Sequence, residues 1–333
     1  MNGASSAFAV MRFLPALSAI AGLCVVAPPV MAQKYPDKPI RLIVQSPAGG
    51  TADLIARVIA QRLGDALGQT VVADNRAGAA GTVSAELTAQ AAPDGYTLLV
   101  ASVSLMAINV TLREGKLTYN PERDFTPVTL TGKVPLAISV LPPFPARTLK
   151  EFIAYAKTRP GKLSYGSAGT GSSNHVVGEM LKTETGIDLV HVPFKGGAPA
   201  MAMLLANQLD VYIATVPTIV PMVQAGRIRV IAVSSARRSP AFPEVPTMAE
   251  AGLPGFDTTS WFCIVGPAGI PKAIVMRLNS EIVNILNNPE VHERLTAAGV
   301  NVESGTPEAL RAFVHAEIQK MRKSVKFSGA TVD

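Results

Sequence analysis

The sequence is poor in the residue patterns that enzymes use for catalysis. It contains no Gly-x-Ser-x-Gly motif, and none of its Gly-Lys pairs completes a phosphate-binding loop. The run Gly169-Thr170-Gly171 lacks the third glycine of a dinucleotide-binding motif, because Asn174 stands there. The four histidines show no metal-ligand spacing: His175, His191, His292 and His315. We therefore expect no enzymatic activity, no metal and no cofactor.

Cysteine is also scarce, since Cys24 and Cys263 are the only two. Cys24 falls in a leader segment that is expected to be removed, so no intramolecular disulfide is expected in the folded protein. Cys263 lies in the apolar run 261–265 and is expected to be a buried, small hydrophobic residue rather than a nucleophile. Stability must therefore come from packing.

Residues 1–32 are predicted to be a secretory signal peptide. Arg12 is their only charged residue, their apolar stretch is too short to span a membrane, and they end in a small-residue cleavage site at Ala32. A lipoprotein signal that uses Cys24 is the alternative, but Leu23 stands where a small residue is required. We therefore expect cleavage after Ala32 and a soluble periplasmic protein, because no later stretch is long and apolar enough to span a membrane.

Charge and aromatic content exclude other functions. Charged residues make up 16% of the chain and aromatic residues 5%, and no helix-turn-helix, zinc or RNA-binding pattern occurs, so nucleic-acid binding is not expected. The formal net charge of +6 favours anionic ligands by long-range attraction. With 48% hydrophobic content over 333 residues, the chain is expected to form two globular domains.

One strand-turn-helix unit stands near the start of the folded region. Ile40–Val44 is predicted to be a strand and Thr51–Leu67 a helix, with Thr51 or Asp53 as its cap. The turn between them, 45–50, is rich in small residues, so its backbone can approach a ligand closely. Amides in the first turn of a helix lack intrahelical partners, and the helix dipole adds partial positive charge, so this unit is a candidate anion site.

A second unit of the same kind follows about a domain later. A strand ending at Tyr165 leads into the glycine-rich turn Gly166–Gly171, and a helix with Ser172 or Ser173 as its cap follows. An ordinary strand-to-helix turn with no ligand is the alternative interpretation. Two such cradles, one in each domain, are what a cleft needs if each domain grips one end of a small anion.

Further candidate residues follow other predicted strands. Ser102 and Ser104 stand at the carboxyl end of the apolar strand 96–102, which is where open α/β sheets bind ligands, although simple turn roles remain open. Lys195 follows the predicted strand Val190–Phe194 and either pairs with a carboxylate or is an exposed lysine. His175 is interpreted as a structural or ligand-adjacent residue.

The order of elements predicts an α/β fold with two lobes. The extended stretch Phe125–Val140 is predicted to cross from one lobe to the other, and the strand Asp257–Val265 to return. Helices over 271–286 and 307–323 are expected to cover the first lobe, and a short helix with a capping box is predicted over 246–252. The predicted division assigns 33–132 and 257–333 to lobe 1, and 133–256 to lobe 2.

Several segments carry a family resemblance, and they run in order across almost the whole chain after the leader. These segments are Tyr35-Pro36-Asp37-Lys38-Pro39-Ile40, Ala48-Gly49-Gly50 with Asp53 and Ala56-Arg57, Asn75-Arg76-Ala77-Gly78, Pro93-Asp94-Gly95-Tyr96-Thr97, Tyr165-Gly166-Ser167 through Gly171-Ser172 and His175, Phe194-Lys195-Gly196-Gly197-Ala198-Pro199-Ala200, Pro246-Thr247 with Glu250-Ala251-Gly252, and Trp261-Phe262. Through them the chain resembles the solute-binding proteins of tripartite tricarboxylate transporters, also called Bug-type receptors.

The resemblance implies a type II periplasmic-binding fold whose two lobes close over an organic acid. It implies that backbone amides of the two turns hold the carboxylates. Together with the serines above, the candidate ligand-binding residues are Ala48, Gly49, Gly50, Thr51, Ser102, Ser104, Ser167, Gly169, Thr170, Gly171, Ser172, Lys195, Gly196 and Gly197. Gln45, Ser46 and Ala48 depart from the family's usual proline, aromatic and proline, so the wall of the first lobe is expected to be smaller and more polar here.

The predicted function is capture of a small carboxylate for delivery to the membrane permease subunits of a tripartite transporter, by a monomer. A periplasmic module that senses the ligand and feeds a signalling partner is the alternative. A hydrolase of carboxylate esters is a third hypothesis, which the absence of an obvious nucleophile makes weak.

Overall fold

The computed structural model describes residues 35–331 together with Met1. The predicted signal peptide, with its cleavage site at Ala32, lies outside the described residues except for Met1. Within the described part, no helix has the length and apolarity needed to cross a membrane.

Nine strands of the described residues form one mixed sheet in the order β2-β1-β3-β9-β4-β7-β5-β6, with β8 paired to β4. Their bounds are β1 Ile40–Val44, β2 Val71–Asn75, β3 Thr97–Ser102, β4 Phe125–Val140, β5 Leu163–Ser167, β6 Leu189–Pro193, β7 Val211–Thr215, β8 Arg229–Val233 and β9 Thr259–Pro267. The helices are α1 Thr51–Leu67, α2 Thr82–Ala89, α3 Asn109–Leu112, α4 Leu149–Lys157, α5 Ser173–Thr185, α6 Gly197–Leu205, α7 Val216–Gln224, α8 Lys272–Asn287, α9 Pro289–Ala297 and α10 Pro307–Ser328, with a 3-10 turn at Ala79–Gly81 and a π-helical turn at Ser104–Ile108.

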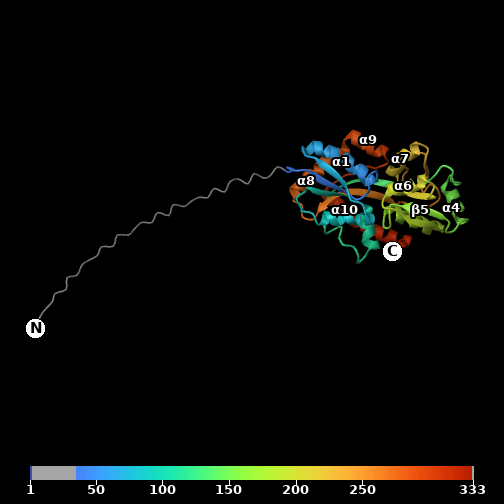
Figure 1. Ribbon diagram of the computed structural model, residues 1–333, viewed down its shortest axis with the longest axis horizontal. Coiled ribbons are helices and arrows are strands. Elements are labelled where there is room, and N and C mark those ends of the chain that lie inside the picture. Colours follow the sequence, from blue (N-terminus) through green and yellow to red (C-terminus); the bar gives the residue numbers. More distant parts are fainter. Residues whose placement is uncertain (2–34, 332–333) are drawn as a thin grey trace. The chain divides into compact units, whose positions relative to one another are not determined.

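Two long strands join the two halves of the sheet, as predicted. β4 and β9 are antiparallel neighbours from the pair Phe125 and Pro267 to the pair Pro135 and Thr259. Beyond Pro135, β4 continues and pairs with β7 and β8 instead. In Figure 1 the first and last parts of the folded chain, blue and red, lie on one side and the yellow-green middle part on the other. The predicted α/β, two-lobed fold is confirmed; the exact lobe boundaries stay a prediction.

Four hydrophobic clusters stabilise these halves. In lobe 1, α1 and α8 cover one face of the sheet, and α10 covers the other. In lobe 2, α4 and α5 pack on one face, and α6 and α7 on the other. The helix α10 does more than cover lobe 1, because its residues share a cluster with Val176 of α5 and Thr183 donates a hydrogen bond to the Ser328 carbonyl (3.4 Å).

The prediction of a helix over 246–252 is wrong, although the predicted capping box is present. The Thr247 amide donates to Glu250 and the Glu250 amide donates to Thr247, both at 3.0 Å. The segment forms a single β-bridge between Thr247 and Val233, followed by turns. No second helical turn can form, because Gly252 has a φ of 115° and Pro254 follows. The predictions also missed α9, which begins at Pro289 with Asn288 as its cap.

Candidate functional site

A cavity of about 310 Å³ lies where the carboxyl ends of the parallel strands of both lobes meet. Its walls come from the segments that follow β1, β2, β3, β5, β6 and β7, with β9 behind them. The lining residues are Gln45, Ser46, Pro47, Gly50, Thr51, Ala52, Ala77, Gly78, Ala80, Gly81, Ser102, Ser104, Arg113, Ala168, Gly169, Thr170, Ser172, Ser173, Asn174, Pro193, Phe194, Lys195, Gly196, Gly197, Tyr212, Thr215, Thr218, Ser260 and Phe262. Open α/β sheets bind small ligands at this end of their strands.

The first turn presents helix amides to the cavity. Gly50 is the N-cap of α1 without a side-chain cap, and among the described residues no group accepts from the amides of Thr51 and Ala52. Asp53, predicted as a possible cap, instead accepts a hydrogen bond from the Gly49 amide at 3.0 Å and lies outside the cavity wall. The α1 terminus therefore offers two amide donors to the cavity, and their binding of an anion stays a prediction.

Asp53 fixes this turn without adding negative charge to the cavity. Burial alone would raise the pKa of its carboxyl group, but hydrogen bonds from Arg57, Gly49 and Asn75 outweigh burial and hold the pKa below its ordinary value. The carboxylate is therefore ionised and paired with Arg57 at 3.0 Å. Asn75 also donates to the Ser46 carbonyl at 2.9 Å, which ties the turn to β2.

The second turn is capped as predicted. Ser172 is the N-cap of α5, and its hydroxyl accepts from the His175 amide at 3.2 Å. The Ser173 amide donates to Ser104 of lobe 1, and no described group accepts from the Asn174 amide, which lies on the cavity wall. The preceding strand runs on to Ser167, two residues beyond the predicted end at Tyr165.

Two stacked histidines contact this glycine-rich turn and help to fix its conformation. The rings of His175 and His191 are 4.2 Å apart at an interplanar angle of 15°. The Gly171 amide donates to His175 Nδ1 at 3.3 Å, and Ser167 Oγ, which accepts from the Gly169 amide, lies 2.7 Å from His191 Nε2. Both contacts fit neutral imidazoles, and the bond from Gly171 agrees with the structural alternative of the two roles, structural or ligand-adjacent, that the sequence left open for His175.

Acidic conditions should weaken this support. Burial, with a smaller contribution from His175, lowers the pKa of His191 from 6.5 to about 4. Below pH 6.5 the unfolded chain binds a proton at this histidine while the native state does not, so the unfolding free energy falls between pH 6.5 and 4. The loss is at most about 3 kcal/mol, since each pKa unit corresponds to about 1.4 kcal/mol and the ring is partly exposed.

His191→Gln should flatten this pH dependence, because glutamine keeps an acceptor for Ser167 but does not titrate. Urea denaturation at several pH values between 4 and 7 measures it. His292→Gln, at an exposed position, serves as the control and should follow the wild type. Parallel curves for His191→Gln and the wild type would contradict the assignment.

Two more helices begin at the cavity. Gly196 is the N-cap of α6 and Thr215 that of α7, and both line the cavity. The N-termini of α1, α5, α6 and α7 therefore converge on one space. Each contributes partial positive charge and first-turn donors, so their sum favours a bound anion.

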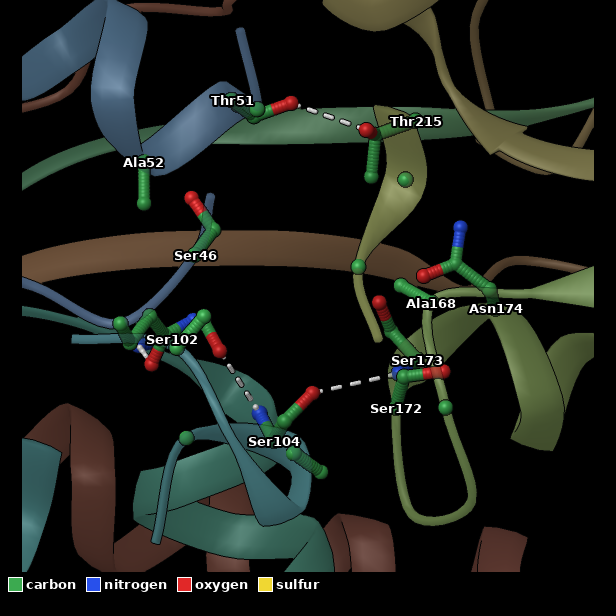
Figure 2. Close-up of a pocket in the computed structure, with 18 of the residues that line it drawn as sticks. Ser46, Thr51, Ala52, Ser102, Ser104, Ala168, Ser172, Ser173, Asn174 and Thr215 are labelled. Carbon is green, nitrogen blue, oxygen red and sulfur yellow. Dashed lines mark hydrogen bonds between the residues drawn. The ribbon is translucent and has the colours of Figure 1, made fainter. Parts of the chain in front are cut away.

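The two lobes touch across the cavity at both ends (Figure 2). Thr51 Oγ1 and Thr215 Oγ1 are 2.8 Å apart at one end, and the Ser173 amide donates to Ser104 Oγ at 3.2 Å at the other. Ser104 is itself positioned by a 3.2 Å bond from its amide to Ser102 Oγ. These direct contacts between lobes describe a closed arrangement.

The structure brings ten of the fourteen predicted site residues together on the cavity wall. These are Gly50, Thr51, Ser102, Ser104, Gly169, Thr170, Ser172, Lys195, Gly196 and Gly197. The other four do not line it: Ala48 and Gly49 lie in an exposed part of the turn, and Ser167 and Gly171 face the histidine pair. Ligand contact by any of the fourteen stays a prediction.

The sequence reasoning missed Arg113 and Thr215 as lining residues. Thr215 follows the rule that singled out Ser102, because it ends β7 immediately before a helix. Arg113 follows the short helix α3 and carried no local signal, since only the packing of that helix places it at the cavity.

Comparisons with known proteins agree with the resemblance. Residues 55–329 match a protein family described as "Tripartite tricarboxylate transporter family receptor". Protein BugT of Bordetella pertussis is 37% identical over 320 residues, which cover 96% of this chain and 98% of that protein.

Solved structures are similar as well. Rpa4515 of R. palustris, solved with adipate, has a TM-score of 0.87 and 36% identity, over 90% of this chain and 100% of that one. MatC from Rhodopseudomonas palustris, solved with bound malate, has a TM-score of 0.83 and 33% identity, over 87% and 100%. The match of residues 55–329 and the near full-length similarity to BugT show that this chain belongs to the tripartite tricarboxylate transporter receptor family.

Proposed function

We propose that this chain is a periplasmic receptor that captures a small organic carboxylate between its lobes and delivers it to the permease subunits of a tripartite transporter. The observation that carries the proposal is the cavity itself. Four helix N-termini converge on it, Arg113 and Lys195 line it, and none of its lining residues in the described part of the chain is Asp or Glu. Such a space attracts anions and offers no site for a cation.

The relatives and the leader support the same function. Two similar proteins were solved with adipate and with malate, which are both carboxylates. The predicted signal peptide, cleaved after Ala32, would deliver a monomer to the periplasm, where a receptor of this family works.

Hydrolysis of an ester is disfavoured because the serine whose hydroxyl contacts a histidine ring, Ser167, does not reach the cavity. Ser167 Oγ lies 2.7 Å from His191 Nε2, but the Ser167 side chain is fully buried and does not line the cavity. A nucleophile must reach its substrate, so this pair has a structural role. The protein is proposed to bind its ligand without converting it.

Closure of the lobes is the proposed mechanism of capture. The lobes follow the predicted boundaries, 33–132 with 257–333 and 133–256, and β4 and β9 act as the hinge between them. A ligand that contacts both turns binds the closed state better than the open one, and so shifts the population by its difference in affinity. The bonds between Thr51 and Thr215 and between Ser104 and Ser173 add to the closed state.

A thermal-shift screen tests the proposal. The protein without its leader, unfolded and refolded to remove bound molecules, is screened against mono-, di- and tricarboxylates, with the corresponding amides as neutral controls. A ligand at 100 times its Kd stabilises the native state by about 2.7 kcal/mol, so the Tm should rise with acid concentration and not with the amides. If no carboxylate raises the Tm, the proposal fails.

A further inference from the structure

We propose that the cavity is built for a dicarboxylate without an amino group, and that Arg113 binds its second carboxylate. The inference rests on the proposed function and narrows its substrate class. Three observations support it. The Arg113 side chain is half-buried and unpaired among the described residues, Arg113 and Lys195 both line the cavity, and no described lining residue is acidic.

The Arg113 side chain has no hydrogen-bond or ion-pair partner among residues 35–331. It lies directly after α3, and its amide donates to the Asn109 carbonyl at 2.9 Å, so the backbone fixes its position at the cavity wall. The residue is half-buried, and its Nε is buried with no hydrogen-bond partner among the described residues. No acidic side chain of the described part pairs with it. A carboxylate in the cavity would find a guanidinium group on its wall, and guanidinium and carboxylate form paired hydrogen bonds.

The segments next to the two cationic residues lie at opposite ends of the cavity. The helix α3, which immediately precedes Arg113, lies against Gly171, where a Cβ would come within 2.5 Å of Asn109 Oδ1. Lys195 precedes Gly196, where a Cβ would come within 2.6 Å of Pro47. The Ser104–Ser173 bond marks the first end and the Thr51–Thr215 bond the second (Figure 2). A ligand with negative charge at both ends fits this arrangement better than one with a single charge.

An ammonium group has no acidic partner in this cavity. Among the described lining residues, none is Asp or Glu, and the helix N-termini add further positive potential. A zwitterionic amino acid would place its ammonium among these groups, which is unfavourable. The cavity therefore selects against aspartate relative to succinate, and against glutamate relative to glutarate.

Arg113 is the residue expected to discriminate between dicarboxylates and monocarboxylates. Lys195 is exposed, so solvent and salt screen its charge, while Arg113 is half-buried and acts at closer range in a less polar environment. Removal of the Arg113 charge should therefore reduce binding of the second carboxylate and leave the first, held by helix amides, in place.

Calorimetry with matched acids tests this. The Kd is measured for succinate with butanoate, glutarate with pentanoate, and adipate with hexanoate, each pair differing by one carboxylate. In the pair that fits the cavity, the wild type should prefer the dicarboxylate by about 10- to 100-fold. Arg113→Gln should reduce this preference to less than about threefold while the monocarboxylate Kd stays the same. The amino acids should bind more weakly than the matching diacids.

Lys116→Gln is the control, because it removes one positive charge three residues away at an exposed position outside the cavity. It should keep the wild-type preference. Arg113→Lys keeps the charge without the forked donors, so its preference for the dicarboxylate should lie between those of the wild type and Arg113→Gln. If Arg113→Gln does not fold, the inference is tested by the preference of Arg113→Lys and by the wild-type Kd values for the acid pairs.

Two results would overturn the inference and leave the proposed function standing. One is a wild type that binds both members of every pair equally. The other is an Arg113→Gln variant that weakens mono- and dicarboxylates alike. If no acid of either series binds, the proposed function itself fails.

Discussion

Ala168→Asp is expected to lower carboxylate affinity by about 100- to 1000-fold. Ala168 belongs to the second turn and lines the cavity, so an aspartate there places a negative charge in the proposed ligand site (Figure 2). Two unit charges 4 Å apart repel by about 4 kcal/mol at an effective dielectric constant of 20, and each 1.4 kcal/mol is tenfold in Kd. Calorimetric titration with the best acid from the thermal screen measures the effect.

Ala168→Asn is the matched control, since it has the size and polarity of aspartate without the charge. It should bind within about tenfold of the wild type. Equal losses in the two variants would show that size, not charge, decides, and would count against an anion site. Gly171→Asp is a poorer test, because Gly171 has a φ of 85° and a side chain there would meet Asn109, so loss of binding would not identify its cause.

Gly196→Val is expected to prevent closure and to weaken binding at least about 100-fold. A Cβ at this position would lie 2.6 Å from Pro47 Cδ, which belongs to the opposite lobe. The two lobes would have to separate to relieve the contact, and the closed state that holds the ligand would become unfavourable. Small-angle X-ray scattering at saturating ligand should give a larger radius of gyration than for the wild type.

Gly186→Val separates this effect from backbone strain. Both glycines have positive φ, 111° for Gly196 and 68° for Gly186, so valine strains the backbone at either position. Gly186 has no atom within 4 Å of its Cβ position and lies at the far end of α5. Its variant should lose stability but keep the wild-type Kd. Compact, tightly binding Gly196→Val protein would contradict the closed arrangement.

Local patterns were sufficient for much of the fold. The bounds predicted for β1, α1 and β4 agree with the structure, and the Ser172 cap forms as expected. Apolar periodicity, small-residue turns and caps are short-range signals, so they can be interpreted without tertiary contacts. The capping box at Thr247 shows the limit of this approach, because its two hydrogen bonds form although no helix follows.

Long-range packing decided the rest of the candidate site. Gly49 and Gly171 belong to the right turns, yet their amides are taken by Asp53 and His175, which only the folded chain reveals. Arg113 has no local signal, and its helix reaches the cavity because it packs against the turn that contains Gly171.

Residue patterns along the chain are sufficient to indicate two strand-turn-helix units and an α/β fold of two lobes, and they include no recognisable catalytic motif. These properties follow from residue types at short spacing along the chain. Packing between distant segments, in contrast, selects the amides that face the cavity, brings four helix N-termini together there and adds the half-buried Arg113. Those properties depend on groups from distant parts of the chain that burial brings together, and local sequence does not encode their distances.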